Sequence, residues 1–518
     1  MDSGAKALWQ TLQAQGVEVC FANPGTTELD LVRALEGPDS LRCVLGLQEN
    51  VCTGAADGYG RMSGRPAATL LHLGPGFANG IANLHNARRA RTPIVNVIGD
   101  HMSWHLPYDA PLTSDIESLA RPVSGWVHRI DSRGDVSPAA REAVRQSQAH
   151  GGQGATLIFP ADFQAAAAPG APAQPEQAPE EGAAEAVWDA QAVASRLRQA
   201  RAPLFLLGGG GERSALSARG QCAVARLIAV LGGTAYAETF PARAERGAGL
   251  PAFDRLPYFP EPARAVLDAA DLVVLVGALE PITYFGYEGH PSALVPAERQ
   301  LLLCLPGADA ATRLEQLADL LQAPAHVSGA QPPMPPLQAG ELTPARIGQV
   351  LTRTLPHGAI VSVEGGTCGY PFYAASAAAA AHTALTNTGG AIGQGLPVAL
   401  GAAIACPGRQ VVALLSDGST QYTIQTLWTL AHEQLPVVIL IAANHQYGIL
   451  RNELRRGSAE LGEKSLQLTS LDRPRIDWVA LAQAYGVRAC RVDEAQALEA
   501  ALRDGFARPG PLLIEMAL

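Results

Sequence analysis

The sequence predicts an α/β protein with three doubly wound domains, each built on a parallel sheet, and three observations lead to this fold class. The chain has 518 residues, too many for a single hydrophobic core. Short β-branched or leucine-rich runs alternate with helical patterns, as in parallel sheets with crossover helices. Two segments of linker composition divide the chain into pieces of ordinary domain size.

The two linkers are expected at residues 164–186 and 323–341, which are rich in Pro, Gly and Gln, with Ala and Glu also frequent in the first. Neither segment has the apolar periodicity of a packed element. We therefore expect an N-terminal domain over residues 1–165, a middle domain over 187–325 and a C-terminal domain over 340–518. The first and third pieces read as variants of one architecture, although no sequence repeat relates them.

Ten apolar runs are the expected strands. They lie at residues 17–21, 43–47, 67–72 and 94–98, then 203–207 and 272–276, and finally 359–363, 410–415, 436–442 and 512–515. In open α/β sheets, ligands bind at the carboxyl ends of the strands. Polar residues that directly follow these runs are therefore the candidate site residues.

Composition excludes several classes of protein. A net charge of −10 argues against nucleic acid as the main partner. There is no uninterrupted apolar run of about 18 residues, so no membrane span is expected. The N-terminus begins an amphipathic helix rather than a signal peptide. Eight cysteines without a CxxC pair suit reduced thiols. We expect a cytoplasmic, multidomain enzyme.

The most informative motif pairs Asp417 with Asn444, which follows it by 27 residues. Each residue comes directly after an apolar run, so both are expected at the carboxyl ends of neighbouring strands. Carboxylate and amide oxygens, with backbone carbonyls and phosphate oxygens, form the shell that Mg²⁺ prefers. The pattern favours a Mg²⁺-held diphosphate, although an ordinary Asp-Gly turn and a strand-end asparagine explain the motif equally well when it is taken alone.

Three N-terminal motifs accompany this pair. The chain reads Asn-Pro-Gly-Thr-Thr-Glu from Asn23, Gln-Glu-Asn from Gln48 and Leu-His-Leu-Gly-Pro-Gly from Leu71. In this order, and with the aspartate motif in the last third, the chain resembles the thiamine-diphosphate (ThDP) enzymes that include pyruvate and benzoylformate decarboxylases and acetolactate synthases. The resemblance covers essentially the whole chain. It implies ThDP and Mg²⁺ as cofactors, with pyrimidine-binding, middle and diphosphate-binding domains in that order.

The motifs mix two subfamilies. Most resemble benzoylformate decarboxylase, while Gly74-Pro75-Gly76 is similar to acetolactate synthases, which lack a histidine at the position of His72. The resemblance implies a 2-oxoacid decarboxylase or carboligase that works by ylid attack on the keto carbon and loss of CO₂. The alternatives are an acetolactate synthase acting on pyruvate, a flavin-dependent oxidase, and an inactive ThDP-binding scaffold.

The resemblance also implies roles for N-terminal residues. Glu49 would hydrogen-bond N1′ of the aminopyrimidine ring and so promote loss of the C2 proton. His72 would act as acid or base on the substrate, because imidazole titrates near neutrality. A histidine that satisfies local backbone groups is the alternative. Thr26 would face the substrate carboxylate. The second active-site histidine of benzoylformate decarboxylases falls near residues 284–287, where this chain has none.

On the metal side, the resemblance implies that Asp417, Asn444 and the backbone carbonyl of Gln446 ligate Mg²⁺. The cofactor-binding residues would be Glu49, Gly365, Gly366, Thr367, Ile392, Gly418, Ser419, Asn444, Gln446 and Tyr447. Ile392 stands where the family places the aliphatic wedge that bends ThDP. The chain departs from the family at Ser416 and Ala443, where glycine and asparagine are usual, and serine is less tolerant of an unusual φ.

The run Gly208–Gly211 follows an expected strand, but the G-x-G-x-x-G pattern with its acidic partner is incomplete. Related middle domains bind FAD or ADP in some members and nothing in others. We favour no nucleotide here, with FAD as the alternative. The resemblance further implies a homo-oligomer, a dimer of dimers with active sites at the subunit interface.

Overall fold

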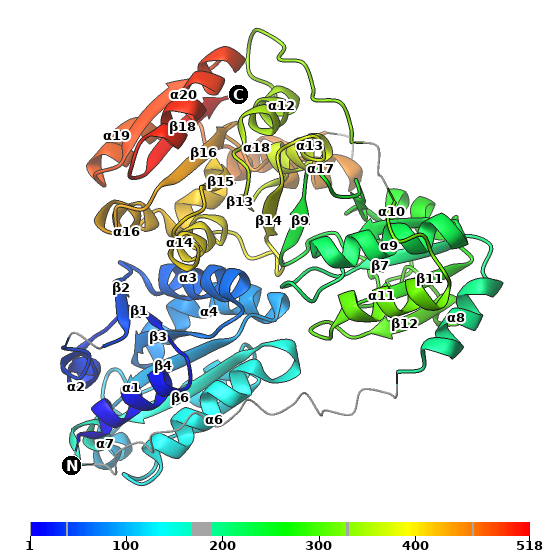
Figure 1. The fold of residues 1–518 in the computed structure, drawn as a ribbon. Coiled ribbons are helices and arrows are strands. Elements are labelled where there is room, and N and C mark those ends of the chain that lie inside the picture. Colours follow the sequence, from blue (N-terminus) through cyan, green and yellow to red (C-terminus); the bar gives the residue numbers. More distant parts are fainter. Residues whose placement is uncertain (1, 38–39, 168–187, 328–330, 458–459) are drawn as a thin grey trace.

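The computed structural model describes residues 2–37, 40–167, 188–327, 331–457 and 460–518, and these form three sheets flanked by helices. In Figure 1 the first sheet lies at the lower left, the second at the right and the third at the top. Every pair of neighbouring strands is parallel except β14 with β9. The expected α/β class with three parallel sheets is confirmed.

The first sheet has six strands in the order β2-β1-β3-β4-β6-β5. Its strands are β1 Val19–Asn23, β2 Arg42–Leu45, β3 Ala67–His72, β4 Ile94–Asp100, β5 Trp126–Arg129 and β6 Gly154–Pro160. Its helices are α1 Gly4–Ala14, α2 Leu29–Arg33, α3 Glu49–Ser63, α4 Leu73–Ala90, α5 Ile116–Ala120, α6 Val136–Gln148 and α7 Ala161–Ala165. The central strands β3, β4 and β6 are almost wholly buried because helices cover both faces of the sheet.

The second sheet has five strands in the order β10-β8-β7-β11-β12. These are β7 Pro203–Leu207, β8 Thr234–Ala237, β10 Asp254–Arg255, β11 Leu272–Val276 and β12 Gln300–Cys304. The helices around it are α8 Ala190–Gln199, α9 Ala218–Leu231, α10 Pro260–Asp268 and α11 Ala310–Leu320.

The third sheet has seven strands in the order β17-β18-β16-β15-β13-β14-β9. These are β9 Ala244–Arg246, β13 Ala359–Val363, β14 His382–Thr386, β15 Val411–Ser416, β16 Val437–Ala443, β17 Arg488–Val492 and β18 Leu512–Ala517. Its helices are α12 Pro344–Thr354, α13 Gly366–Ser376, α14 Gly395–Ala405, α15 Asp417–Thr420, α16 Thr426–His432, α17 Gly448–Gly457, α18 Glu463–Thr469, α19 Trp478–Ala484 and α20 Ala495–Ala507.

Two local expectations are corrected. The first linker does not begin at Gln164, because this residue lies in α7, is fully buried, and donates from Nε2 to the carbonyl of Phe159 at 2.7 Å. Most of that linker, residues 168–187, lies outside the described residues. Strand β9 comes from the stretch assigned to the middle domain, yet it pairs with β14 of the third sheet. The domain limits themselves stay a prediction.

The first and third sheets share one hydrophobic core through α3 and α14, which lie against each other in Figure 1. The two helices pack at backbone contact: a Cβ at Gly58 or at Gly401 would overlap a main-chain oxygen of the facing helix. A buried ion pair within α3 also supplies a hydrogen bond across this boundary. Arg61 binds Asp57 at 2.6 Å and donates to the carbonyl of Thr386 at 2.7 Å. This contact holds the edges of the two sheets in a fixed relation.

Among the described residues, no helix is long and apolar enough to cross a membrane. No disulfide joins the cysteines of the described residues.

Candidate active site

Polar residues gather at the carboxyl edge of the first sheet, where β1, β3 and β4 end side by side. His72 is the last residue of β3 and pairs in register with Gly99 of β4. Beyond β1 the short 3₁₀ helix Thr26–Glu28 turns back over this edge. Because neighbouring parallel strands end at the same side of the sheet, Thr26 and His72 are brought to one region, as the motifs predicted.

A buried carboxylate holds the ring of His72. Its Nδ1 lies 2.8 Å from Oε2 of Glu28 and 3.1 Å from Oγ1 of Thr27, while the Glu28 side chain is fully buried. The same carboxylate accepts the Gly25 main-chain N–H at 2.7 Å and the Thr27 hydroxyl at 2.6 Å. A carboxylate facing Nδ1 favours a proton there, which leaves Nε2 as the reactive nitrogen of the neutral ring.

Glu49 is the first residue of α3, behind the N-cap Gln48, whose side chain accepts the Asn50 N–H at 2.7 Å. An acidic side chain in the first turn is stabilised by the helix dipole. Oε2 of Glu49 accepts a hydrogen bond from Asn79 at 3.1 Å. A Cβ at Gly76 would approach the Glu49 carboxylate to 3.2 Å, so the glycine of the Gly-Pro-Gly motif leaves room beside it.

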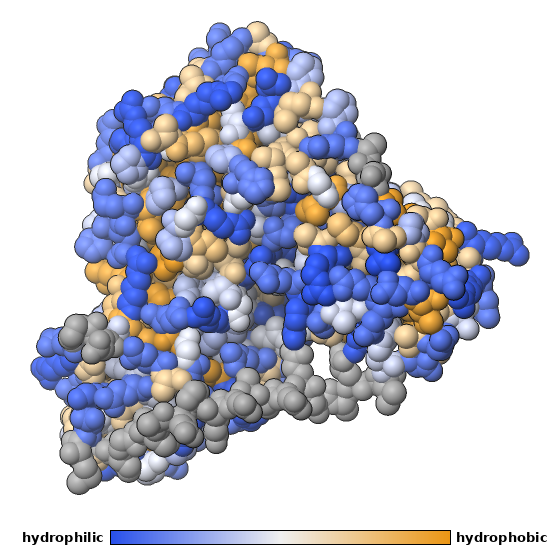
Figure 2. Space-filling view, in the orientation of Figure 1, coloured by the Kyte–Doolittle hydropathy of each residue, from blue (hydrophilic) through white to orange (hydrophobic). Residues whose placement is uncertain are grey.

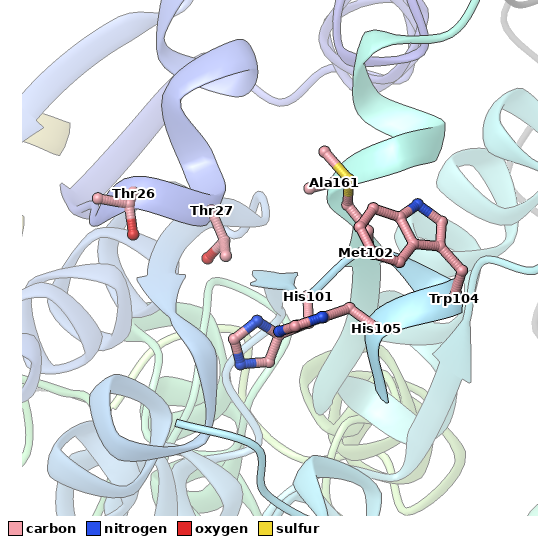
Figure 3. Close-up of a pocket in the computed structure, with 7 residues that line it drawn as sticks. All are labelled: Thr26, Thr27, His101, Met102, Trp104, His105 and Ala161. Atoms are coloured by element: carbon pink, nitrogen blue, oxygen red, sulfur yellow. The ribbon is translucent and has the colours of Figure 1, made fainter. Parts of the chain in front are cut away.

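A cavity of about 270 Å³ opens beside the 3₁₀ helix. Figure 3 shows its lining residues, with the two threonines on one side, Trp104 and Met102 on the other, and two imidazoles between them. These residues are Thr26, Thr27, His101, Met102, Trp104, His105 and Ala161. Since Thr27 both lines this cavity and contacts His72, the cavity adjoins the Glu28–His72 pair.

A second polar group lies at the carboxyl edge of the third sheet. Asp417 follows β15, and Asn444 follows the neighbouring strand β16. The Asp417 side chain accepts main-chain N–H groups of Gly418 at 2.8 Å and His445 at 2.7 Å. Asn444 accepts the Gln446 N–H at 3.2 Å and donates to Thr367 at 3.3 Å. Here the structure brings the predicted metal-side residues together.

The residues of this edge fit a diphosphate with a divalent cation. Burial raises the pKa of Asp417, whose carboxylate has only main-chain donors and the ring of His445, 4.0 Å away. A cation would supply the missing positive charge. No side chain caps the N-terminus of α13 at Gly366, so its first N–H groups are open to phosphate. The ring of Tyr447 lies where a Cβ at Gly418 would stand, 2.6 Å away.

Ser416 does not disturb the turn. Its φ of −102° and ψ of 153° are extended values that any residue adopts. The strained position is on the facing loop, where Gly365 has φ 105° and where a Cβ would overlap the Ser416 hydroxyl. The serine is therefore accommodated by a glycine across from it. Ser419, a further predicted cofactor residue, donates from its hydroxyl to the Ser416 carbonyl at 3.1 Å.

Ile392 lies in the loop between β14 and α14. Side chains of α4, a helix beside the first sheet, donate hydrogen bonds to this loop. Asn86 donates to the carbonyl of Ala391 at 2.8 Å, and Asn83 donates to that of Gly393 at 3.3 Å. Within the described part of the chain, no hydrogen bond joins the Glu49 and His72 group to the Asp417 and Asn444 group. We call these two groups of residues the N-terminal and the C-terminal half-site.

Known families and proteins with similar sequences identify the family of this chain. The N-terminal model of thiamine pyrophosphate enzymes matches residues 2–119, and the C-terminal TPP-binding model matches residues 367–516. The "Putative acetolactate synthase large subunit IlvX" of Mycobacterium tuberculosis is 47% identical, over 100% of this chain and 99% of the relative. The chain belongs to the ThDP-dependent enzymes. Within this family it falls among the 2-oxoacid decarboxylases and carboligases.

Two further matches extend the comparison. The benzoylformate decarboxylase of Pseudomonas aeruginosa is 30% identical, over 98% of both chains. The solved structure of the 4-hydroxybenzoylformate decarboxylase of Rhodococcus jostii RHA1 has a TM-score of 0.84 and 25% identity, and the alignment covers 100% of this chain and 99% of the other. The two half-sites of this ThDP enzyme thus lie in a fold shared over the full length.

Sequence reasoning missed two buried carboxylates of the site. No role is predicted from the sequence for Glu28, which ends the Asn-Pro-Gly-Thr-Thr-Glu motif, or for Glu364, which follows β13. Glu364 turns inward instead and accepts main-chain N–H groups of residues 393, 394 and 395. Burial raises its pKa despite these bonds. A glutamate that directly follows an apolar run was the available signal for Glu364.

In the glycine run Gly208–Gly211 of the second sheet, the space beside Gly208 and Gly209 is occupied by other segments of the same chain. The N–H of Gly209 donates to Oε1 of Glu238 at 2.6 Å. A Cβ at Gly208 would overlap the carbonyl of Gly277, and one at Gly209 would lie 2.7 Å from that of Arg243. These glycines allow close packing of the chain on itself, which supports the expectation of no nucleotide; that expectation stays a prediction.

Proposed function

We propose that the chain is a ThDP- and Mg²⁺-dependent decarboxylase of 2-oxoacids that releases an aldehyde or transfers the remaining fragment to a second carbonyl compound. The observation that carries this proposal is the Glu28–His72 pair beside a cavity, because aldehyde release requires a proton donor next to the reacting carbon. Bound ThDP supplies a nucleophilic carbon and an electron sink for the decarboxylation.

The residues of the N-terminal edge handle protons in this proposal. Glu49 binds the pyrimidine ring at N1′ and stabilises the tautomer that accepts the C2 proton. Nε2 of His72 exchanges a proton with the substrate, while Glu28 fixes the ring and its tautomer. Thr26, on the wall of the cavity, faces the substrate carboxylate.

The residues of the C-terminal edge bind and orient. Asp417, Asn444 and the carbonyl of Gln446 hold Mg²⁺. The diphosphate and the thiazolium ring would contact Gly365, Gly366, Thr367, Ile392, Gly418, Ser419 and Tyr447. The buried position of Asp417, 2% exposed, keeps water from competing for the cation.

The proposed enzyme is a homo-oligomer. No hydrogen bond joins the Glu49 group to the Asp417 group within the described residues, which supports a second copy completing each site. In Figure 2 hydrophobic groups are exposed on the left side, where β2 and α16 lie in Figure 1. Leu45 and Leu47, at the end of β2, are 41% and 42% exposed. A dimer would cover such residues, and two dimers would form the tetramer.

The test is a screen of 2-oxoacids with purified enzyme, ThDP and Mg²⁺. The proposal expects CO₂ release from at least one aromatic or branched 2-oxoacid, with an aldehyde as product. Each acid is also assayed after Glu49→Gln and after Glu36→Gln, an exposed carboxylate far from either half-site. The proposal is wrong if no acid is decarboxylated or if Glu49→Gln leaves turnover intact.

Acetolactate synthesis is the second candidate, favoured by the 47% identical relative with that printed name. The same assay separates the two reactions. Pyruvate alone would then yield acetolactate as the main product, and aromatic 2-oxoacids would release little CO₂. His72 argues for the decarboxylase, since aldehyde release requires a proton on the reacting carbon, whereas carboligation bonds that carbon to the acceptor instead.

A further inference from the structure

The cavity beside Thr27 contains two side chains that the proposed chemistry does not use, His101 and His105. His101 directly follows β4, and His105 lies in the 3₁₀ helix Ser103–Tyr108. Their rings meet edge to face, with centroids 5.5 Å apart. Figure 3 shows both imidazoles between the threonines and Trp104.

The position of His101 is set by its backbone. Its N–H donates to Oδ1 of Asp100 at 2.7 Å, and the other oxygen of this carboxylate binds Arg129. The following helix is tied down as well, because Ser103 donates to Asp162 at 2.9 Å from its N–H and at 2.6 Å from its hydroxyl. The imidazole therefore stands on a braced segment of the cavity wall.

Nε2 of His101 is shielded from solvent and has no hydrogen-bond partner among the described residues. A shielded polar atom without a partner is costly, and a ligand that offers one gains binding free energy. The cavity also borders the His72 pair through Thr27, whose Oγ1 lies 3.1 Å from Nδ1 of His72. A substrate whose keto carbon faces His72 would therefore extend its side chain toward His101.

We propose that His101 and His105 form a polar subsite that holds the substrate side chain and selects 2-oxoacids bearing a hydroxyl group. This inference rests on the proposed function. The hydroxyl pairs with Nε2 of His101, which either donates or accepts because a hydroxyl does both. Met102, Trp104 and Ala161 contact the carbon skeleton of the side chain.

Charge favours a neutral hydroxyl over a second carboxylate. The buried carboxylate of Glu28 contacts Thr27 at 2.6 Å, and no arginine or lysine of the described residues pairs with it. Asp100 is the residue before His101, and its charge is matched by Arg129. An added anion would meet no arginine or lysine among the residues that line the cavity, whereas a hydroxyl needs only a hydrogen-bond partner.

The experiment compares kcat/KM for matched pairs of substrates that differ by one hydroxyl. The pairs are 4-hydroxybenzoylformate with benzoylformate, and 4-hydroxy-2-oxobutyrate with 2-oxobutyrate, each measured on holoenzyme. The variants are His101→Phe, which removes the polar atom, and His101→Gln, which keeps one. His326→Phe, at an exposed histidine outside the cavity, is the matched control.

In the wild type we expect the hydroxylated member of at least one pair to be preferred by about 10-fold or more. His101→Phe should reduce this preference to about twofold while the hydroxyl-free partner keeps its kcat/KM, and His101→Gln should retain part of it. If no pair is discriminated, or if the preference survives in His101→Phe, the subsite does not exist. Absence of CO₂ release from every acid would instead overturn the proposed function, and the subsite with it.

Discussion

Two glycine loops follow strands in this chain, and they are used in opposite ways. Gly208–Gly211 follows β7 of the second sheet, and Gly365-Gly366 follows β13 of the third. In the second sheet Gly209 already donates to Glu238, and a Cβ at Gly208 would overlap a carbonyl. In the third sheet no side chain caps the helix that begins at Gly366. A glycine loop indicates a ligand only where its N–H groups are left open.

The polar atoms nearby differ in the same way. Glu238 is partly buried, and its Oε1 accepts the Gly209 N–H of its own loop. Asp417 is 2% exposed at the carboxyl edge of the third sheet, and its carboxylate partners among the described residues are main-chain N–H groups and the ring of His445. In the proposed function, Glu49 and His72 of the first sheet form the complementary half-site. Variants of Glu49, Glu238, Asp417 and Glu28 should therefore differ in what they change: catalysis, stability or cofactor binding.

Removing the carboxylic acid at Glu49 should have the largest effect. Glu49→Gln keeps the shape but loses the proton-relay function, so kcat should fall by about 1,000-fold. ThDP binding, followed by quenching of protein fluorescence, should change little, because Asp417 and its neighbours hold the diphosphate. A loss of binding that matches the loss of kcat would show that Glu49 acts through affinity instead.

Substitution of Glu238, beside the glycine loop Gly208–Gly211, should change the stability of the folded protein. Burial raises the pKa of Glu238 from 4.5 to about 7, while the Gly209 N–H and Arg91 lower it. The folded state thus holds the proton more tightly than the unfolded state, so this contribution to stability is full below pH 4.5 and is lost as the pH rises through 7. Glu238→Gln should stabilise the protein at pH 8 by about 3 kcal/mol.

The effect of Glu238→Gln should vanish at pH 4.5, and thermal unfolding at both pH values measures it. Glu212→Gln, in the same glycine loop but exposed, is the control and should show no such dependence. If Glu238→Gln stabilises the protein equally at both pH values, ionisation of Glu238 is not the cause of the stabilisation.

Asp417 tests the open loop. Asp417→Ala removes a Mg²⁺ ligand, so the Kd for ThDP measured with Mg²⁺ should rise by at least about 100-fold. Chelation of Mg²⁺ in the wild type should release ThDP, and added Mg²⁺ should restore binding. Asp493→Ala, at an exposed aspartate, should bind as the wild type does. Unchanged ThDP binding after chelation would show that Mg²⁺ is not needed to hold the cofactor.

Glu28 should have a smaller effect, because it acts through His72. Glu28→Gln presents an amide to Nδ1 and no longer favours a proton there, so kcat should fall about 10-fold. Glu28→Asp keeps a carboxylate near the ring and should retain more of kcat than Glu28→Gln does. Equal losses of kcat in the two variants would indicate a structural role for Glu28 only.

Most of the fold could be predicted because the strands are short apolar runs in a long alternating pattern. Ala67–His72 and Leu272–Val276 were expected at the observed bounds. The juxtaposition of Asp417 and Asn444 was also predictable, since two successive apolar runs formed neighbouring parallel strands. The local sequence pattern was sufficient to predict the structure wherever elements adjacent in the sequence are also adjacent in space.

The rest depends on contacts between distant parts of the chain. Strand β9 leaves the middle segment to pair with β14, more than a hundred residues later, and no local pattern encodes that choice. Glu28 meets His72 only because two loops from different strands converge. The shielded Nε2 of His101 is likewise a property of packing. Each of these requires three-dimensional coordinates.

The central claim is that the N-terminal edge of one chain and the C-terminal edge of another complete one site. Mixing the inactive variants Glu49→Gln and Asp417→Ala under conditions of subunit exchange tests it directly. Half of the dimers would be mixed, and each would contain one intact site, so about a quarter of wild-type activity should return. If differently tagged subunits co-purify and the mixture stays inactive, the two edges do not meet between chains and the account is contradicted.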